Sequence, residues 1–498
     1  MTTEGSATRV SVIGGGLAGC ECALQLADRG IPVTLYEMRP QVMTPVHRGE
    51  GLAELVCSNS LKSTKPDSAA GLLKHELSCL GSHLLACARE CDVPAGGALA
   101  VDRDAFSAAV GRAVAERPLI EVVRREVTEI PEEGPVVIAA GPMCSDALAG
   151  RVTALVGGEH LAFFDAAAPI VDAASLDMGT LFSQSRYEEG GAGDYLNAAM
   201  DREQYDAFIE ALLGAERVIA RDFERRDLFQ ACQPLEEVAR TGHDALRFGA
   251  FKPVGITDPA TGRRPWAVVQ LRAENRQRTA YNLVGFQTNL TFPEQRRVFR
   301  MVPGLEGAEF FRYGVMHRNT FVDAPHTLDA TFAVRGLRRV RLAGQITGTE
   351  GYVEAMASGL LAALNVAADL AGTPLESLPA DTALGALVAY ATNPATSGYQ
   401  PMHVNFGLMP ALETTQRMRK QERYQAYARR AHESLRAWLG RNATAAGIAL
   451  PAEPEGEDSA CCHGPVNTTP AVSGSPARRD DPATPSAPAV AAGGPARS

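Results

Sequence analysis

The spacing of hydrophobic positions near the N-terminus predicts a strand, a turn and a helix in close succession. Residues 9–13 are rich in β-branched side chains, which is typical of a short buried strand. Residues 20–29 place cysteine, alanine and leucine at helical spacing, and a glycine follows. A second apolar strand is expected over residues 32–36. A strand, turn, helix and strand within about 30 residues have the size of a βαβ unit.

A similar pattern recurs far along the chain. Apolar runs at residues 135–141 and 338–344 predict further buried strands, and the second is followed by glycines and a long apolar helix to residue 370. Because such units lie near opposite ends of the chain, we expect an α/β fold in which both ends build one Rossmann-like dinucleotide-binding domain. The intervening chain is expected to form an inserted α+β domain. The predicted boundaries are residues 8–160 and 304–450 for the first domain and 161–303 for the insert.

The composition changes after about residue 450. The last 48 residues contain nine prolines and few large hydrophobic side chains. Such a segment cannot bury enough apolar surface to offset the entropy lost on ordering. We therefore expect residues 451–498 to form a disordered tail.

Charge is distributed unevenly along the chain. The net charge of -10 argues against a protein that coats nucleic acid by bulk charge. Two segments nevertheless are strongly basic: residues 263–300 hold eight arginines and two glutamates, and residues 415–430 hold six basic residues and one acid. Both contain aromatic residues, and this combination is typical of RNA-binding surfaces. Ordinary solvated helix faces are the alternative.

A glycine-rich turn follows the first predicted strand. Gly14 would permit the tight turn, Gly16 would let a pyrophosphate approach the backbone, and Gly19 would let the helix pack closely. Glu37 lies 18 residues after Gly19 and would bind ribose hydroxyls. An acid there disfavours a 2′-phosphate, so FAD or NAD is expected rather than NADP. A glycine turn without a ligand is the alternative.

A second group of glycines precedes the long predicted helix. The start of this helix could face a flavin ring and stabilise negative charge on its reduced form, although a plain loop is also possible. The predicted nucleotide-binding residues are Gly14, Gly15, Gly16, Leu17, Ala18, Gly19, Glu37, Gly344, Gly348 and Gly351.

Two of the ten cysteines lie in settings that suit chemistry. No pair has Cys-x-x-Cys spacing, so neither a zinc ribbon nor a dithiol centre is expected, and no metal site is predicted. Cys57 precedes three small polar residues and Lys62, which predicts a turn or helix start where N–H groups and the ammonium could lower the pKa of the thiol. Cys232 precedes Pro234, which indicates a loop or a helix boundary. Either cysteine could instead be inert and buried.

A short polar stretch offers a different kind of candidate site. His317, Arg318 and Asn319 combine a planar ring, a guanidinium and an amide, which together could stack on and hydrogen-bond a planar heterocycle. A structural histidine in a loop is the alternative.

The N-terminus shows no basic and apolar signal pattern, and no stretch approaches the roughly 20 apolar residues that span a bilayer. A cytoplasmic location with reduced thiols is therefore expected.

With these motifs in place, the sequence closely resembles the bacterial folate- and FAD-dependent tRNA (uracil-5-)-methyltransferases. The likeness covers residues 8–438, and the tail departs from the family pattern. The Cys-Ser-Asn-Ser stretch and the Met-His-Arg-Asn stretch are far more specific than the glycine motif, which many flavoproteins share. The matching stretches are residues 12–19, 53–63, 93–103, 232–236, 313–320, 344–359 and 405–410.

The resemblance implies methylation of C5 of the T-loop uridine of tRNA, position 54, to give ribothymidine. Methylenetetrahydrofolate would supply the carbon, reduced FAD would carry the methylene and the electrons, and NADPH or NADH would regenerate the flavin. Cys57 and Cys232 would be the two catalytic cysteines: one adds to C6, and the other acts as base at C5 or protects the flavin adduct. His317 would stack on the pterin, with Arg318 and Asn319 in the folate site. tRNA is the expected partner, and no membrane or obligatory protein partner is expected.

The need for a thiolate also follows from the chemistry. Uracil C5 is a poor nucleophile, and a thiolate that adds at C6 creates an enolate that can attack an electrophilic carbon. Loss of the C5 proton then needs a base. The alternatives are the related, longer flavoprotein that modifies the wobble uridine of tRNA, a small-molecule flavin oxidoreductase, and a non-enzymatic RNA-binding flavoprotein.

Overall fold

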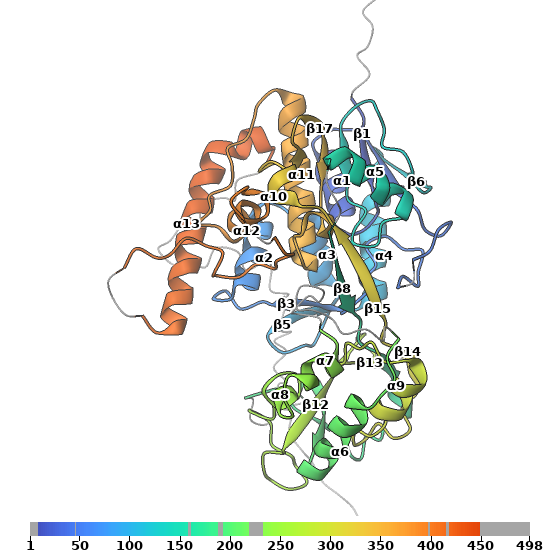
Figure 1. Ribbon diagram of the computed structural model, residues 1–498. Coiled ribbons are helices and arrows are strands. Elements are labelled where there is room, and N and C mark those ends of the chain that lie inside the picture. The colour runs from blue at the N-terminus through green and yellow to red at the C-terminus, as the bar shows by residue number, and fades with distance from the viewer. Residues whose placement is uncertain are drawn as a thin grey trace, which may run out of the picture. The chain divides into compact units, whose positions relative to one another are not determined.

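The first sheet of the computed structural model joins strands from both ends of the chain (Figure 1). β1 (Val10–Ile13) lies between β2 (Val33–Glu37) and β7 (Val136–Ile138), and it is parallel to both. β7 in turn pairs in parallel with β17 (Leu337–Leu342), almost 200 residues further along the chain. The predicted α/β fold with a Rossmann-like parallel sheet is confirmed. The edge strands are β6 (Ile120–Arg124) and β16 (Ala333–Val334).

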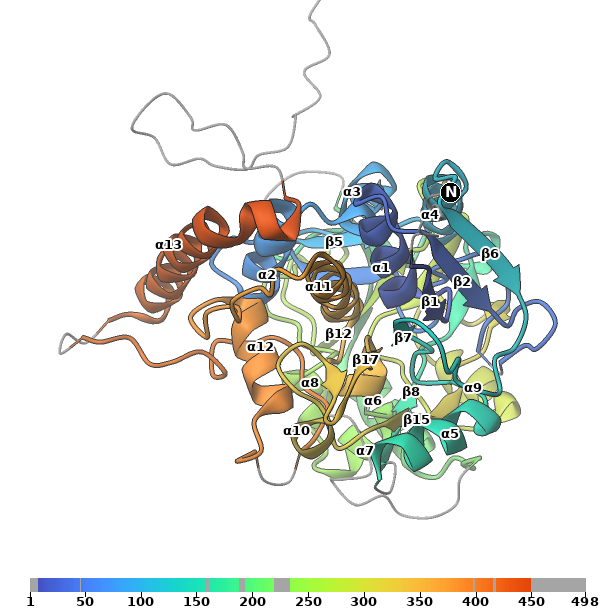
Figure 2. The ribbon, with the colours of Figure 1, turned by 90° about the horizontal axis from the view of Figure 1, so that it is seen from above.

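Two helices from opposite ends of the sequence pack together against this sheet. α1 (Leu17–Asp28) contacts α11 (Tyr352–Ala371), and Figure 2 shows them side by side. The approach is close because α11 has a glycine at Gly359, where a Cβ would lie only 2.1 Å from the carbonyl oxygen of Ala18. α1 starts at Leu17, three residues earlier than predicted, because the chain turns helical directly after the glycine turn.

α11 corrects one expectation from the sequence. Among the described residues it is the one helix long and apolar enough to cross a membrane by length and composition. However, 83% of its apolar window is buried inside the protein. A helix that is apolar around most of its surface and covered on all sides is a core helix.

A second, antiparallel sheet is built from the middle of the chain. Its strand order is β10-β11-β12-β13-β9-β14, and it has a hydrophobic core of its own. Phe208, Phe251, Phe286 and Phe299 pack against one another in this core. The strands are β9 (Ile170–Asp172), β10 (Phe182–Ser183), β11 (Tyr195–Met200), β12 (Ala267–Ala273), β13 (Ala280–Leu283) and β14 (Phe310–Arg312).

A two-stranded antiparallel ribbon links the regions that hold the two sheets. β8 (Leu161–Ala166) leads into the second sheet, and its partner β15 (Met316–Phe321) leads back out of it. β14 belongs to the second sheet although it lies beyond residue 303. The domain division drawn from the sequence stays a prediction.

The structure describes residues 8–44, 46–157, 161–187, 193–218, 233–396, 399–414 and 418–448, with the backbone alone at 161–166, 317 and 318. Cys232 and the predicted tail, residues 451–498, lie outside this part of the chain. The remaining strands are β3 (Ser60–Ser63), β4 (Asp92–Val93) and β5 (Ala98–Val101). The remaining α-helices are α2 (Ala69–Cys79), α3 (His83–Glu90), α4 (Arg103–Ala115), α5 (Asp146–Val156), α6 (Arg202–Leu213), α7 (Leu235–Arg240), α8 (Ala245–Phe248), α9 (Phe292–Phe299), α10 (Ala324–Thr327), α12 (Ala383–Thr392) and α13 (Lys420–Ala446).

Candidate functional site

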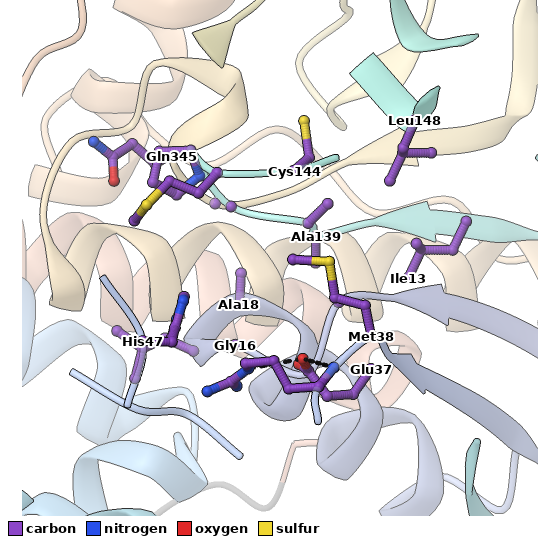
Figure 3. A pocket seen from close by; sticks show the side chains of 18 of the residues that line it. Ile13, Gly16, Ala18, Glu37, Met38, His47, Ala139, Cys144, Leu148 and Gln345 are labelled. Atoms are coloured by element: carbon purple, nitrogen blue, oxygen red, sulfur yellow. Dashed lines mark hydrogen bonds and ion pairs between the residues drawn. The ribbon is translucent and has the colours of Figure 1, made fainter. Parts of the chain in front are cut away.

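A pocket opens where the parallel strands β1, β2 and β7 end (Figure 3). In open α/β sheets, ligands bind at this carboxyl edge. Both ends of the chain contribute to the walls. The lining includes Gly14, Gly16, Leu17, Ala18 and Glu37 from the first βαβ unit and Gly344, Gly351 and Tyr352 from the second.

The glycine turn has one open position and two crowded ones. Gly14 has φ of +110°, and a Cβ there would lie 2.4 Å from the carbonyl oxygen of Ala139. A Cβ at Gly19 would lie 1.9 Å from the carbonyl oxygen of Gly14, so α1 packs tightly against the turn. A Cβ at Gly16, by contrast, would meet no atom of the described chain within 4 Å. The backbone at Gly16 therefore borders open space in which a ligand could lie.

Two of the helices that start at the pocket, α1 and α11, begin without a side-chain cap, whereas α5 is capped by Ser145. Gly16 precedes α1 and Gly351 precedes α11, and neither supplies a capping side chain. The first N–H groups of a helix have no partner within the helix, and together with the helix dipole they favour an anion. Open space at Gly16 and two uncapped helix starts fit a dinucleotide with a pyrophosphate.

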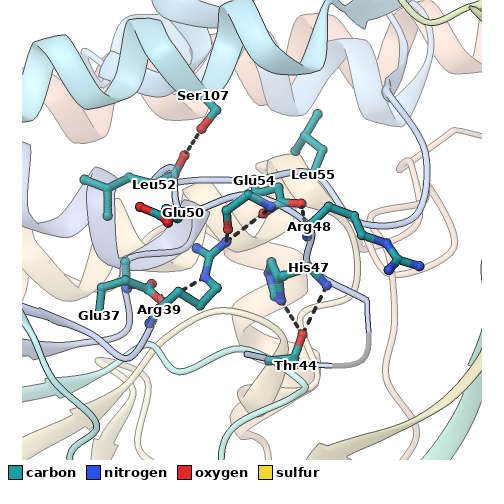
Figure 4. Close-up of polar contacts among 12 residues, drawn as sticks. Glu37, Arg39, Thr44, His47, Arg48, Glu50, Leu52, Glu54, Leu55 and Ser107 are labelled. Atoms are coloured by element: carbon teal, nitrogen blue, oxygen red, sulfur yellow. Dashed lines mark hydrogen bonds and ion pairs between the residues drawn. The ribbon is translucent and has the colours of Figure 1, made fainter. Parts of the chain in front are cut away.

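Glu37 lines the pocket with its carboxylate already engaged by the protein (Figure 4). The carboxylate accepts hydrogen bonds from the N–H of Gly15 at 3.0 Å, the N–H of Arg39 at 3.0 Å and Nε of Arg39 at 2.9 Å. Burial alone would raise the pKa of Glu37, but the hydrogen bonds and charge of Arg39 outweigh it and lower the pKa. Arg39 is held in turn by Glu54, 2.7 Å from Nη1. Contact between Glu37 and a ribose stays a prediction.

Three of the predicted nucleotide-binding residues support the site without lining the pocket. Gly15 and Gly19 belong to the turn itself. Gly348 has φ of +79°, and a Cβ there would meet the hydroxyl of Tyr399 at 2.2 Å.

The sequence did not single out Cys144, which does line the pocket. Burial raises the pKa of Cys144 to about 11, so it stays a neutral thiol near pH 7.

Cys57 lies in a partly exposed bend directly after Val56, a pocket residue. The backbone N–H groups of Cys57 and Ser58 both donate to the hydroxyl of Tyr352, at 2.9 and 3.1 Å. Tyr352 is the first residue of α11 and lines the pocket. Burial and the neighbouring Cys57 raise the pKa of Tyr352, so the phenol stays protonated. One side chain thus touches both the pocket and the Cys57 bend.

Two arginines hold the residues on either side of Ser58. Arg272 of β12 donates from Nη2 to the Ser58 hydroxyl and from Nε to the Asn59 side-chain oxygen, both at 2.7 Å. Burial lowers the pKa of Arg272. Arg103 of α4 donates from Nη2 to the Cys57 carbonyl at 3.2 Å. Burial alone would lower the pKa of Arg103, but the charge and hydrogen bonds of Glu274 raise it.

A third arginine completes this set. Arg312 of β14 donates from Nη2 to the carbonyl oxygen of Val56. Burial, followed by the nearby charge of Arg103, lowers the pKa of Arg312. The Cys57 bend is therefore held by α4, by α11 and by two strands of the second sheet. The sequence did not indicate that any of these three arginines lies at the Cys57 bend. For Arg272, the available signal was a charged residue in a fully buried strand, with Glu274 directly after the end of that strand.

The expectations for the neighbours of Cys57 need one correction. Cys57 lies in a bend before β3, which agrees with the turn, one of the two alternatives expected there. The correction concerns Lys62. Lys62 was expected to act on the thiol, but its ammonium pairs with the buried carboxylate of Glu354, 3.1 Å away. The N–H groups expected to face the thiol are those of Cys57 and Ser58, which are bound by Tyr352.

The polar stretch predicted to bind a heterocycle lies on β15. The backbones of His317 and Arg318 pair with Asp165 and Phe164 of β8, and their side chains lie outside the described part of the chain. Asn319 is 0% exposed, and neither its amide oxygen nor its amide nitrogen has a hydrogen-bond partner among the described residues. Burying an amide without partners is costly, so Asn319 is a candidate for contact with a ligand or an ordered water.

Known proteins resemble this chain over almost all of the described residues. The methylenetetrahydrofolate--tRNA-(uracil-5-)-methyltransferase TrmFO of Geobacter sulfurreducens is 55% identical over 430 residues, which cover 86% of this chain and 98% of that protein. The chain belongs to this methyltransferase family. The TrmFO of Pelobacter propionicus is 54% identical over 87% of this chain, and that of Heliobacterium modesticaldum is 51% identical over 87%.

A broader family also matches. The model of the family described as glucose inhibited division protein A covers residues 9–374 of this methyltransferase homologue. The crystal structure of Aquifex aeolicus GidA, form II, has a TM-score of 0.63 over 87% of this chain and 73% of that chain, at 15% identity. The form I crystal gives the same TM-score and identity. At this identity the likeness establishes the shared fold, whereas the much higher identity to the methyltransferases places the chain in their branch.

Proposed function

We propose that this protein methylates C5 of uridine in tRNA, with methylenetetrahydrofolate as the one-carbon donor. The observation that carries the proposal is the sequence identity of 55% to the Geobacter sulfurreducens methylenetetrahydrofolate--tRNA-(uracil-5-)-methyltransferase, over 98% of the length of that protein. The geometry adds a cysteine in a tightly held bend beside the pocket that the glycine turn lines. We infer further that the target is the T-loop uridine, that the product is ribothymidine, and that the reaction takes place in the cytoplasm.

FAD is the cofactor that the pocket and the family together support. The glycine turn at Gly16 would receive the pyrophosphate, Glu37 would face the ribose, and Gly344 and Gly351 would lie along the ring system. Bound FAD would carry the one-carbon unit and supply the two electrons that turn a methylene into a methyl group, with NADPH or NADH as their source.

The Cys57 bend suits a thiol that must reach a nucleobase. One of the two catalytic cysteines, Cys57 or Cys232, adds its sulfur to uracil C6, and the C5=C6 electron pair moves onto C5 and O4. C5 then forms its bond to the one-carbon unit, a base removes the C5 proton, and the C6–S bond breaks to release the thiolate. The bond from that carbon to its carrier would break, and two electrons from the reduced flavin would convert the carbon to a methyl group. The rigid hold on Val56, Cys57 and Ser58 fixes where the Cys57 sulfur can lie.

The folate is expected at β15. The Asn319 amide offers one acceptor and two donors that the described protein does not use, and a pterin presents complementary edges. His317 and Arg318 adjoin it in sequence, and we propose that they stack on and orient the same ring.

One experiment tests this function. The protein is incubated with an unmodified tRNA transcript, methylenetetrahydrofolate labelled in its methylene carbon and NADPH or NADH, and the nucleosides are then analysed. We expect labelled ribothymidine, and none from a transcript in which the T-loop uridine is replaced by cytidine. Label at the wobble uridine instead would place the protein with the wobble-uridine enzymes. Nicotinamide oxidation without any labelled nucleoside would make it a small-molecule oxidoreductase.

The two cysteines can be separated with the same assay. Cys57→Ala and Cys232→Ala should each abolish ribothymidine formation. On RNA with 5-fluorouracil in the T-loop, fluorine cannot leave as the proton does, so the C6 adduct is trapped. The variant that lacks the nucleophile forms no covalent complex. Methylation at the wild-type rate by both variants would refute a catalytic role for either thiol.

A further inference from the structure

The N-terminal half of α13 carries cationic and aromatic side chains on one face. Arg423, Tyr424 and Tyr427 lie three, four and seven residues after Lys420, and Arg430 lies three residues after Tyr427, so all five share one side of the helix. The Lys420 ammonium is 5.5 Å from the ring centre of Tyr424, and the guanidinium carbon of Arg423 is 5.8 Å from it. The guanidinium carbon of Arg430 is 5.3 Å from the ring centre of Tyr427. We call this surface the α13 face.

A residue from the preceding loop extends the aromatic surface. The ring centre of Phe406 lies 4.6 Å from that of Tyr424 and 5.3 Å from that of Tyr427, with the second pair nearly parallel at 19°. Arg430 fixes the same loop because it donates to the carbonyl oxygens of Pro410 and Ala411, at 2.6 and 3.0 Å. The three rings therefore form one preassembled cluster.

The loop that carries Phe406 is tied to the catalytic region. Its Met402 N–H donates to the carbonyl of Gly348 at 2.9 Å, and its Val404 N–H donates to the carboxylate of Glu354 at 3.2 Å. Glu354 lies two residues after Tyr352, whose hydroxyl binds the Cys57 bend. A short, hydrogen-bonded path therefore connects the α13 face with Cys57.

Two of the three cations of the α13 face remain available to a ligand, whereas Arg430 pairs with Asp381 at 3.5 Å. Lys420 and Arg423 are exposed, and neither forms an ion pair with an acid of the described chain. Residues 419–430 hold five basic residues and one acid on a protein of net charge -10. This surface can therefore attract a polyanion locally although the whole molecule repels one.

The other basic segment differs in its contacts. On α9, Arg297 pairs with Glu294, and Arg300 donates from Nε and Nη2 to the carbonyl oxygen of Ala308. Arg296 is exposed on the same helix. Two of the three arginines at this end of the segment thus have partners within the protein.

We propose that the α13 face is a tRNA-binding surface. Lys420 and Arg423 contact backbone phosphates, and the cluster of Phe406, Tyr424 and Tyr427 stacks on unpaired loop bases, which present an aromatic face whatever their identity. The inference rests on the proposed function and specifies which surface holds its substrate.

Binding to an unmodified tRNA transcript tests the surface independently of catalysis. The full-length protein with its bound cofactor, the variant K420Q/R423Q and a matched control, R429Q/R436Q, are titrated at several salt concentrations. Arg429 and Arg436 are exposed and seven residues apart on the other side of α13, so the control removes the same charge from the same helix. We expect K420Q/R423Q to weaken binding at least tenfold and to reduce the log-log salt slope by about two units. The control should stay within about twofold of wild type.

A third variant tests stacking. Tyr424→Ala should weaken binding of tRNA but leave the salt slope unchanged, because it removes no charge. Equal losses in K420Q/R423Q and R429Q/R436Q would reduce the effect to general charge and overturn the proposal, as would wild-type binding by K420Q/R423Q. These results are distinct from failure of the proposed function, in which wild-type protein forms no ribothymidine at all. If wild type methylates tRNA and K420Q/R423Q binds it unchanged, only the surface is wrong.

Discussion

The hydroxyl oxygen of Tyr352 lies 2.9 Å from the backbone nitrogen of Cys57, 295 positions earlier in the chain. The same oxygen accepts the N–H of Ser58 at 3.1 Å. Tyr352 also lines the pocket, so a shift of its ring caused by a bound cofactor would move the support of the Cys57 backbone. A ligand in the pocket and the backbone of Cys57 would therefore share Tyr352 as a common contact.

Tyr352→Phe should separate this support from the wall of the pocket. The variant keeps the ring but leaves two N–H groups without their acceptor, which costs about 1 kcal/mol of unfolding free energy for each. We expect FAD content near that of wild type and ribothymidine formation at least tenfold slower. Tyr390→Phe is the matched control, because its hydroxyl donates to Gln400 in an exposed position. Full activity in Tyr352→Phe would show that the bend holds without the hydroxyl.

Arg272→Gln should disturb the bend from its opposite side. Arg272 holds Ser58 and Asn59, and its loss should lower the free energy of unfolding by about 2 kcal/mol and sharply reduce the methylation rate. Arg276→Gln is the comparison: Arg276 donates to the carbonyls of Asp92 and Glu90, and it is exposed. The control should lose at most about 1 kcal/mol and keep its activity. Chemical denaturation and single-turnover rates distinguish the two, and equal rates would remove Arg272 from the list of positioning residues.

Gly16→Val tests the placement of the cofactor. Nothing in the described chain lies within 4 Å of a Cβ at Gly16, so the apoprotein should keep its melting temperature while the purified protein loses its yellow colour. Gly19→Val should behave differently, because a Cβ there clashes with the carbonyl oxygen of Gly14 at 1.9 Å and should destabilise the fold itself. Stoichiometric FAD in Gly16→Val would place the pyrophosphate elsewhere.

Asn319→Leu should uncouple stability from substrate binding. Asn319 is fully buried and its amide has no partner among the described residues, so leucine should leave the free energy of unfolding unchanged or raise it. If the amide binds the pterin, the KM for methylenetetrahydrofolate should rise at least tenfold. Asn197 is equally buried, but its amide nitrogen donates to three carbonyl groups and its oxygen accepts from Gln270. Asn197→Leu should therefore destabilise the protein by about 2 kcal/mol or more, and an unchanged KM in Asn319→Leu would refute the folate assignment.

Acid should loosen the contact between α2 and α13. The rings of His75 and His432 are 4.0 Å apart, and burial followed by the charge of His432 lowers the pKa of His75 to about 4. The unfolded chain takes up this proton near pH 6.5, whereas the folded chain resists until about pH 4, so stability falls as pH drops through that window. Urea unfolding at pH 7 and pH 5 should show this fall, and His75→Gln should reduce it. An identical fall in His75→Gln would assign the effect to other groups.

Local features of the fold could be predicted from the sequence because their causes are local. β1, the glycine turn and α1 depend on side chains within about 20 residues of one another, and hydrophobic spacing encodes them directly. The start of α1 was misplaced by three residues because glycines and small side chains give no periodic signal. Gly348 was assigned to the pocket because the pattern of glycines does not show that Tyr399 lies against it.

The surroundings of Cys57 could not be predicted, because they are determined by long-range packing. The sequence pointed to Lys62, the nearest cation along the chain. In the structure, the ammonium of Lys62 pairs with Glu354, which lies 292 positions away. The cations that contact the Cys57 bend include Arg272 and Arg312, which come from strands more than 200 positions away. The unpartnered Asn319 likewise emerges only once the residues around it are placed in three dimensions. The family resemblance identified the cysteine, but neither pattern nor resemblance indicated what holds it.

The residues that line the pocket extend from Ile13 to Ala355 in the sequence. The parts of the pocket wall are therefore synthesised at widely separated times. The nucleotide-binding fingerprint leaves the ribosome among the first residues, but the wall that must close over the cofactor emerges only after the whole second sheet has been made. Until then, the face of α1 that later packs against α11 has no cover. A nascent chain must therefore wait for most of its length before it can retain a flavin. A chain that ends before α11 would carry the fingerprint but would lack the part of the pocket wall that Tyr352 and Ala355 form.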